Sequence, residues 1–79
     1  MDEIAILARA GANIRERRIR AQLSLDDLEH RAHVGRATLV NAEHTGRMNA
    51  KTLILIARAL GCTVDDLLGD IGTSEDDWA

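Results

Sequence analysis

The chain has 79 residues, with ten Lys and Arg, 13 Asp and Glu, and a formal net charge of −3. A chain of this length forms one domain with a modest core, which excludes a deep catalytic cleft on a separate scaffold. Its apolar residues are almost all Ala, Ile, Leu and Val, with no Phe, Tyr or Pro. Since few segments are strand-like, an all-α fold is predicted.

The sequence carries no sign of membrane insertion or secretion. No uncharged apolar run is longer than that at residues 53–57, whereas a membrane-spanning helix needs about 20 apolar residues. Asp2 and Glu3 stand where a signal peptide carries positive charge. The single Cys62 excludes an internal disulfide and fits a reducing compartment. We therefore expect a cytoplasmic protein that does not associate with membranes.

The charges are sorted along the chain. Residues 9–58 hold all ten basic groups and five acids, a local charge of +5, while residues 59–79 hold six acids. A basic centre with acidic ends can present a positive face to phosphates, but it is also compatible with a solvated mixed surface. The asymmetry alone is therefore a weak indication of nucleic acid binding.

A first helix is predicted over about residues 2–21, because apolar and small residues recur at spacings of three and four. The stripe consists of Ile4, Leu7, Gly11, Ile14, Arg18 and Ala21. Gly11 either interrupts this helix or lets a neighbouring helix approach closely. We expect Ile4 and Leu7 to lie beyond the compact part of the domain. There they either contact a second subunit, or the helix end frays or packs within the monomer.

Residues 24–43 are predicted to form two short helices joined by a tight turn. Apolar residues at helical spacing define one face of each helix. They are Leu25, Leu28 and Ala32 in the first helix, and Leu39 and Ala42 in the second. The two apolar faces are expected to meet.

Local signals mark the boundaries of this helical pair. Ser24 and Asp27 have the spacing of a capping box, which sets the start of the first helix. In the connection, Val34 can plug between the helices, and Gly35 supplies either an unusual backbone angle or a helix start. The pair is a helix-turn-helix candidate.

Two further helices and a tail complete the chain. Asn49 caps a helix over residues 50–60 that Gly61 ends, and Thr63 with Asp66 repeats the capping-box spacing before a fifth, short helix. The acidic residues after Gly69 lack periodicity, so a flexible tail is predicted. Trp78 in this tail is either solvated or an anchor for a partner protein or a second subunit.

Several of these motifs together resemble a known family. They are residues 24–28 (SLDDL), Val34, Leu39, Glu43, residues 56–61 (IARALG), Val64 and Leu67. The chain thus resembles, over about residues 13–69, the helix-turn-helix regulators typified by lambda-like phage repressors and Cro proteins. The resemblance implies a compact five-helix bundle that binds double-stranded DNA as a symmetric dimer, with the helix at residues 36–43 in the major groove. Residues 1–12 would form a helical N-terminal extension, and residues 70–79 a flexible acidic tail.

The chain departs from the family pattern at Glu29, His33 and Gly35. The family commonly has Ala, Gly, and Ser or Thr at these positions. We expect strain at the turn rather than a different fold, since His is among the residues found in the left-handed conformation that Gly usually supplies. The missing hydroxyl at Gly35 removes a helix cap and a phosphate contact.

The outward face of the second helix of the pair supplies the candidates for base reading. On a helical wheel, Leu39 and Ala42 face inward, which leaves Arg36, Ala37, Val40 and Asn41 outward. Arg matches guanine O6 and N7, Asn matches adenine N6 and N7, and small apolar side chains contact the thymine methyl group. The alternative for Arg36 and Asn41 is a solvated surface role.

Residues around this helix are predicted to contact phosphates. They are Ser24 with the N–H groups of its helix, Thr38, Arg47 and Lys51. Separately, Glu43 flanks the inward face and Arg18 lies on the inward stripe of the first helix. A partly buried ion pair between them is predicted to fasten the two helices, as matching positions do in the resembling family.

Other chemistry finds little support in the sequence. His30 and His33 lack two further placed ligands for zinc, and no Ser, His and carboxylate set or Gly-rich phosphate loop is present. We expect neither metal, cofactor nor enzymatic activity. The predicted function is a sequence-specific transcriptional regulator, a repressor acting as a homodimer on a palindromic operator. The alternative is an antitoxin-like or phage-encoded interaction module that binds a protein through the fold and the acidic tail around Trp78.

Overall fold

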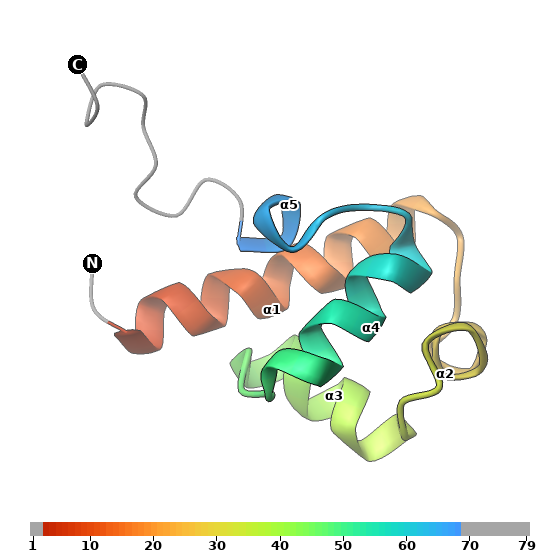
Figure 1. The fold of residues 1–79 in the computed structure, drawn as a ribbon, viewed down its shortest axis with the longest axis horizontal. Helices are drawn as coiled ribbons and strands as arrows, with labels where there is room; N and C mark the ends of the chain where they lie inside the picture. Colours follow the sequence, from red (N-terminus) through yellow and green to blue (C-terminus); the bar gives the residue numbers. More distant parts are fainter. Residues whose placement is uncertain (1–2, 69–79) are drawn as a thin grey trace.

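The structure is a computed structural model that describes residues 3–68. This part of the chain contains five helices and no strand (Figure 1). The helices are α1 (Glu3–Arg20), α2 (Leu25–Ala32), α3 (Arg36–Thr45), α4 (Ala50–Leu60) and α5 (Val64–Leu68). The predicted all-α fold with five helices is confirmed. None of these helices has the length and apolarity needed to cross a bilayer.

Side-chain caps define the helix starts that the sequence predicts. The Ser24 hydroxyl accepts from the Asp27 N–H at 3.0 Å, and the Asp27 carboxylate accepts from the Ser24 N–H at 2.9 Å. Thr63 and Asp66 form the same reciprocal pair at the start of α5, with both distances 3.0 Å. The Asn49 side chain accepts from the N–H of Thr52 at the start of α4. Each cap satisfies backbone donors that the first helical turn leaves free.

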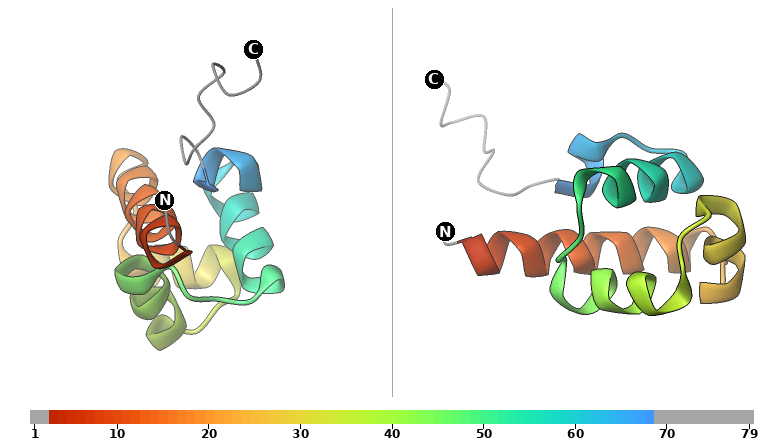
Figure 2. Two further views of the ribbon diagram at one scale, coloured as in Figure 1. Left: turned by 90° about the vertical axis from the view of Figure 1, so that its left-hand side faces the viewer. Right: turned by 60° about the horizontal axis from the view of Figure 1, so that its bottom comes forward.

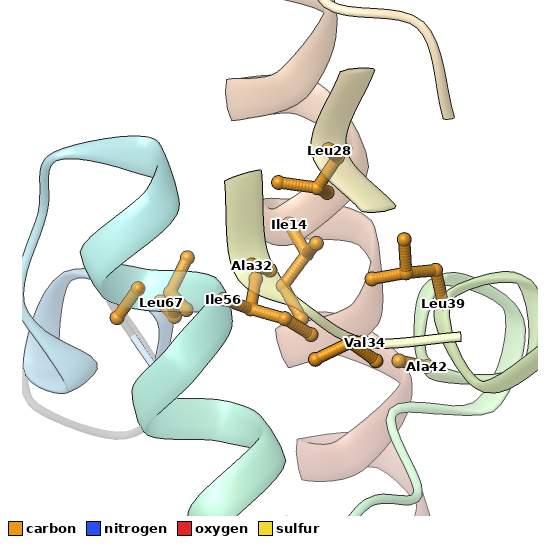
Figure 3. Packing of buried hydrophobic residues seen from close by; sticks show 9 residues of the cluster. Ile14, Leu28, Ala32, Val34, Leu39, Ala42, Ile56 and Leu67 are labelled. Atoms are coloured by element: carbon orange, nitrogen blue, oxygen red, sulfur yellow. The ribbon is translucent and has the colours of Figure 1, made fainter. Parts of the chain in front are cut away.

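The core draws on every helix. The five largest fully buried side chains come one from each element: Ile14, Leu28, Leu39, Ile56 and Leu67. Figure 3 shows them in one cluster together with Ala32, Val34 and Ala42. Because no helix buries its apolar face alone, the bundle forms as a unit.

The long helix α1 is the element on which α3 and α5 pack, while α2 packs on α3 and α4. Figure 2 shows α3 running beside α1, with α4 on the other side of the core. Gly11 lies inside the continuous helix α1, and a Cβ there would lie 2.5 Å from the Ala42 carbonyl oxygen and 2.7 Å from that of Glu43. Of its two predicted roles, Gly11 therefore has the second, which is to let α3 approach closely.

The N-terminal half of α1 differs in part from expectation. Ile4 is 70% exposed, as expected of a residue beyond the compact part of the domain. Leu7 is half-buried, and its backbone lies so close to Gly46 that a Cβ at Gly46 would overlap the Leu7 carbonyl group. Leu7 is therefore part of the compact fold, which corrects the sequence-based expectation. Trp78 and the predicted tail at 70–79 lie outside the described residues.

Candidate DNA-binding site

Helix α3 divides into a buried face and an exposed face. Leu39 and Ala42 are fully buried, and Glu43 is 8% exposed. The outward residues are Arg36, Ala37, Thr38, Asn41 and His44, all exposed, and Val40, which is half-buried. Three of the four residues predicted to read bases are therefore exposed, and the fourth, Val40, is partly exposed.

A bidentate ion pair fixes α3 to α1. Arg18 Nε lies 2.7 Å from Glu43 Oε2, and Arg18 Nη2 donates to Glu43 Oε1 at 3.2 Å. Arg18 Nη1 also donates to the Leu23 carbonyl oxygen at 2.9 Å, which ties in the α1–α2 loop. The side chains are 13% and 5% exposed, so the pair is largely removed from water. This is the ion pair that the sequence predicts, and its geometry restrains both the position and the rotation of α3.

The turn between α2 and α3 contains the predicted unusual backbone. His33 has φ 58° and ψ 41°, the left-handed conformation, and its N–H donates to the Glu29 carbonyl at 2.9 Å. Val34 is 7% exposed and joins the core. Gly35 has φ −61° and ψ 150° and is the N-cap of α3 without a side-chain hydrogen bond. Of the two roles open for Gly35, the helix start is therefore the one observed, and His33 takes the left-handed position.

Arg36, at the first position of α3, has an ionic partner that the sequence did not indicate. Its Nη1 lies 3.1 Å from Asp26 Oδ1 in the first turn of α2, and the two side chains are 54% and 63% exposed. Periodicity relates residues within one helix, so it gives no signal for a pair that spans two helices. Asp26 is the site residue that sequence reasoning missed.

The C-terminal end of α3 is joined to the following loop. Thr45 Oγ1 donates to the Asn41 carbonyl at 2.9 Å and accepts from the Arg47 N–H at 3.1 Å. Asn41 Nδ2 donates to the Arg47 carbonyl at 3.5 Å, a long contact that a better acceptor can replace. Gly46 ends the helix with φ 74°. The predicted base reader Asn41 and the predicted phosphate contact Arg47 are thus brought together.

The predicted phosphate contacts differ in their surroundings. Thr38, Arg47 and Lys51 are exposed, and none of them takes part in a described ion pair. At Ser24, the hydroxyl and the N–H are already engaged by Asp27. Hydrogen bonds from the Ser24 N–H, and then from its hydroxyl, lower the pKa of Asp27, so this helix end carries negative charge at neutral pH. That charge opposes a phosphate at Ser24.

Residues 3–68 also contain the three His of the chain and its single thiol, Cys62. No cluster of three or more His, Cys, Asp or Glu with metal-binding geometry occurs within residues 3–68. Cys62 is half-buried, and desolvation raises the pKa of its thiol. The positive charge of Arg17 lowers this pKa, and the negative charge of Asp66 raises it. A thiol with a raised pKa is a poor nucleophile.

Comparison with known proteins identifies this arrangement. The family model of the Cro/C1-type HTH DNA-binding domain matches residues 13–72, which is more than half of the chain. The match includes α2 to α5 and the part of α1 that carries Ile14 and Arg18. Searches against curated proteins and against solved structures give no match. The chain belongs to the Cro/C1-type helix-turn-helix family of DNA-binding regulators.

Proposed function

We propose that the protein is a sequence-specific regulator of transcription, a repressor that binds a palindromic operator as a homodimer with α3 in the major groove. The observation that carries the proposal is the exposed face of α3, held in place by the buried pair of Arg18 and Glu43. A rigidly mounted helix with exposed polar side chains is what base reading in the major groove requires.

The outward side chains of α3 have complementary chemistry to base edges. Arg36 offers parallel donors for guanine O6 and N7, and Asn41 offers a donor and an acceptor for adenine N7 and N6. Ala37 and Val40 provide apolar contact for a thymine methyl group. These four residues lie on the outward side of the helix, where Val40 is half-buried and the other three are exposed, so they would meet successive base pairs.

Phosphate contacts would position the helix on the duplex. Arg47 follows the C-terminal end of α3 and Lys51 lies in the first turn of α4, while Thr38 lies on α3 itself. Ser24 is a weaker candidate, because the carboxylates of Asp26 and Asp27 follow it in the first turn of α2. Each phosphate neutralised lowers the slope of log affinity against log salt by about 0.9, so binding should weaken steeply with salt.

Two-fold symmetry in the protein would match the symmetry of the operator, with half-sites about one helical turn apart. The exposed Ile4 on α1 is our candidate for a contact between subunits. A dimer bound over a promoter would block transcription by occupying it. The reducing cytoplasm, where a lone thiol is stable, is the proposed location.

The test begins with selection of duplexes from a randomised DNA library by the full-length protein, followed by fluorescence anisotropy on the selected sequence at several salt concentrations. We expect a palindromic consensus. Arg36→Ala combined with Asn41→Ala should weaken binding by at least about 30-fold, because each bidentate contact is worth about 1–3 kcal/mol. Arg58→Ala is the matched control, since Arg58 is an exposed charge on α4 outside the site.

The proposal is wrong if no sequence is enriched and no duplex binds at low salt, or if the double variant binds as tightly as Arg58→Ala. Absence of DNA binding would instead favour the interaction module. In that case a partner protein should be captured by the intact chain and lost when residues 70–79 are removed.

A further inference from the structure

We propose that Asp26 is a positioning residue for base recognition, which holds one edge of the Arg36 guanidinium so that the other edge reads guanine. The inference rests on the proposed function of α3 and adds to it a specificity determinant on a different helix. It is carried by the ion pair of 3.1 Å between Arg36 Nη1 and Asp26 Oδ1.

The pair occupies a particular place among the ion pairs of residues 3–68. Arg18 with Glu43 joins α1 to α3, and Arg20 with Glu16 lies within α1. The pair of Asp26 and Arg36 links the first turn of α2 to the first residue of α3. It therefore lies at the end of the reading helix that enters the groove first in this family of folds.

The donor geometry of Arg36 allows the two contacts at once. A guanidinium carries five N–H donors in a planar fork, and a bidentate contact uses two of them along one edge. Since the described contact to Asp26 is made through Nη1, the edge formed by Nε and Nη2 is available for O6 and N7 of a guanine. Carboxylate and base would then contact different nitrogens of the guanidinium.

The pair affects the direction of the side chain more than the stability of the fold. Both side chains are more than half exposed, and exposed ion pairs contribute little to folding. An unpaired arginine loses its rotamer freedom when it docks on a base, whereas an arginine held by a fixed carboxylate has lost part of it beforehand. Asp26 thus favours the guanine complex over complexes in which Arg36 has no base partner.

The charge of Asp26 has a second effect, on the overall affinity for DNA. A carboxylate beside the DNA-facing end of α3 repels phosphates, which lowers affinity for every sequence equally. The contact that it prepares raises affinity only for duplexes with guanine at the matching position. Discrimination depends on the difference between these affinities, so only the contact to guanine increases it, while the repulsion lowers affinity without changing the preference.

The experiment compares Asp26→Asn with Asp26→Glu and with Asp65→Asn. Asp65 is exposed on α5 and outside the site, so its variant removes the same charge elsewhere. The first probe is the duplex selected by the unmodified protein. The guanine read by Arg36 is the one for which Arg36→Ala abolishes the preference, and three further probes replace this guanine by each of the other bases. The last probe is a scrambled duplex. Circular dichroism of each variant verifies that the helices are intact.

We expect Asp26→Asn to lower the preference for that guanine by about two- to five-fold, the range open to an exposed pair. It should also raise affinity for the scrambled duplex more than Asp65→Asn does. Asp26→Glu keeps the carboxylate and should therefore keep the guanine preference of the unmodified protein. In a protein that already carries Arg36→Ala, adding Asp26→Asn should leave the base preference unchanged.

The inference is overturned if the Asp26→Asn variant prefers guanine as strongly as the Asp65→Asn variant does. It is also overturned if Asp26→Asn increases this preference, since the carboxylate would then hold Arg36 away from the base. Either result leaves the proposed DNA-binding function standing. If the unmodified protein selects no sequence at all, the proposed function and this inference both fail.

Discussion

The buried ion pair of Arg18 and Glu43 gives the sharpest prediction about this fold, a strong energetic coupling in a double-mutant cycle. The variants are Arg18→Ala, Glu43→Ala and the combination of the two. Each single substitution leaves one charge in a site where the partner side chains are only 13% and 5% exposed. The double variant leaves no charge there.

The magnitude follows from desolvation. Stranding one member of a buried pair costs about 3–5 kcal/mol, of which most is the penalty for the unpaired charge. Removing Arg18 also frees the Leu23 carbonyl that accepts from its Nη1, while Glu43→Ala leaves that bond in place. We expect about 3 kcal/mol for each single variant and less than about 3 kcal/mol for the double, because no unpaired charge remains, hence a coupling of at least about 3 kcal/mol.

The assay is urea unfolding followed by far-ultraviolet circular dichroism at 25 °C, which reports on the helices directly. A domain of this size has a free energy of unfolding of about 4–12 kcal/mol, so the single variants remain measurable. If either alanine variant is unfolded without urea, Arg18→Lys and Glu43→Gln repeat the cycle with a smaller perturbation. Single effects that add to within about 0.5 kcal/mol would refute the reasoning, because independent groups behave in that way.

Three further predictions concern packing, pH and assembly. Gly46→Ala should lower the free energy of unfolding by about 2 kcal/mol or more, because Gly46 has φ 74° and a Cβ would overlap the Leu7 carbonyl. Gly35 has φ −61°, and nothing lies within 4 Å of a Cβ built there. Gly35→Ser should therefore change the free energy of unfolding in urea by only about 0.5 kcal/mol. Equal losses of stability in the Gly46 and Gly35 variants would contradict this reasoning. Hydrogen bonds from Ser24 lower the pKa of Asp27 in the folded state. The ionised Asp27 carboxylate therefore stabilises the fold above its unfolded pKa of about 3.9, and this stabilisation is lost as the pH falls through the pKa of the folded state. Asp27→Asn should therefore destabilise the protein at pH 7 and flatten the acid limb of its urea midpoints, whereas an unchanged acid limb would exclude the linkage. Ile4 is 70% exposed, so Ile4→Glu should weaken self-association in sedimentation equilibrium without loss of helix. Ile54→Glu is the control, because Ile54 is an exposed apolar residue on α4. If Ile4→Glu weakens self-association no more than Ile54→Glu does, Ile4 does not belong to the interface.

The site depends on a division between scaffold and reading face. Residues that hold α3 are buried or paired, as Leu39, Ala42 and Glu43 show. Residues that we propose to read DNA are exposed, apart from the half-buried Val40. Substitutions on the outward face should therefore change sequence preference with little effect on folding, and this separation makes the DNA-binding experiments interpretable.

The sequence by itself determined the local features of this protein. Capping pairs such as Ser24 with Asp27 act over three residues, and the helical repeat assigns Leu39 inward and Asn41 outward. Both signals depend only on neighbours in the chain, so they predict helix boundaries and faces without knowledge of the tertiary fold. The pair of Arg18 and Glu43 was also within reach, because each residue lies on or beside an apolar stripe where a charge needs a partner.

Only the tertiary structure decided how closely the helices approach and which exposed charges meet. Gly11 was compatible with a break or with a close contact, and the carbonyl groups of α3 beside it select the contact. Leu7 belongs to the compact fold because Gly46 lets the backbone of α1 come near. The pair of Asp26 and Arg36 arises from the angle between α2 and α3, which the turn through His33 sets. Such contacts depend on distances between elements, and a single sequence fixes these only through the packing of the whole core.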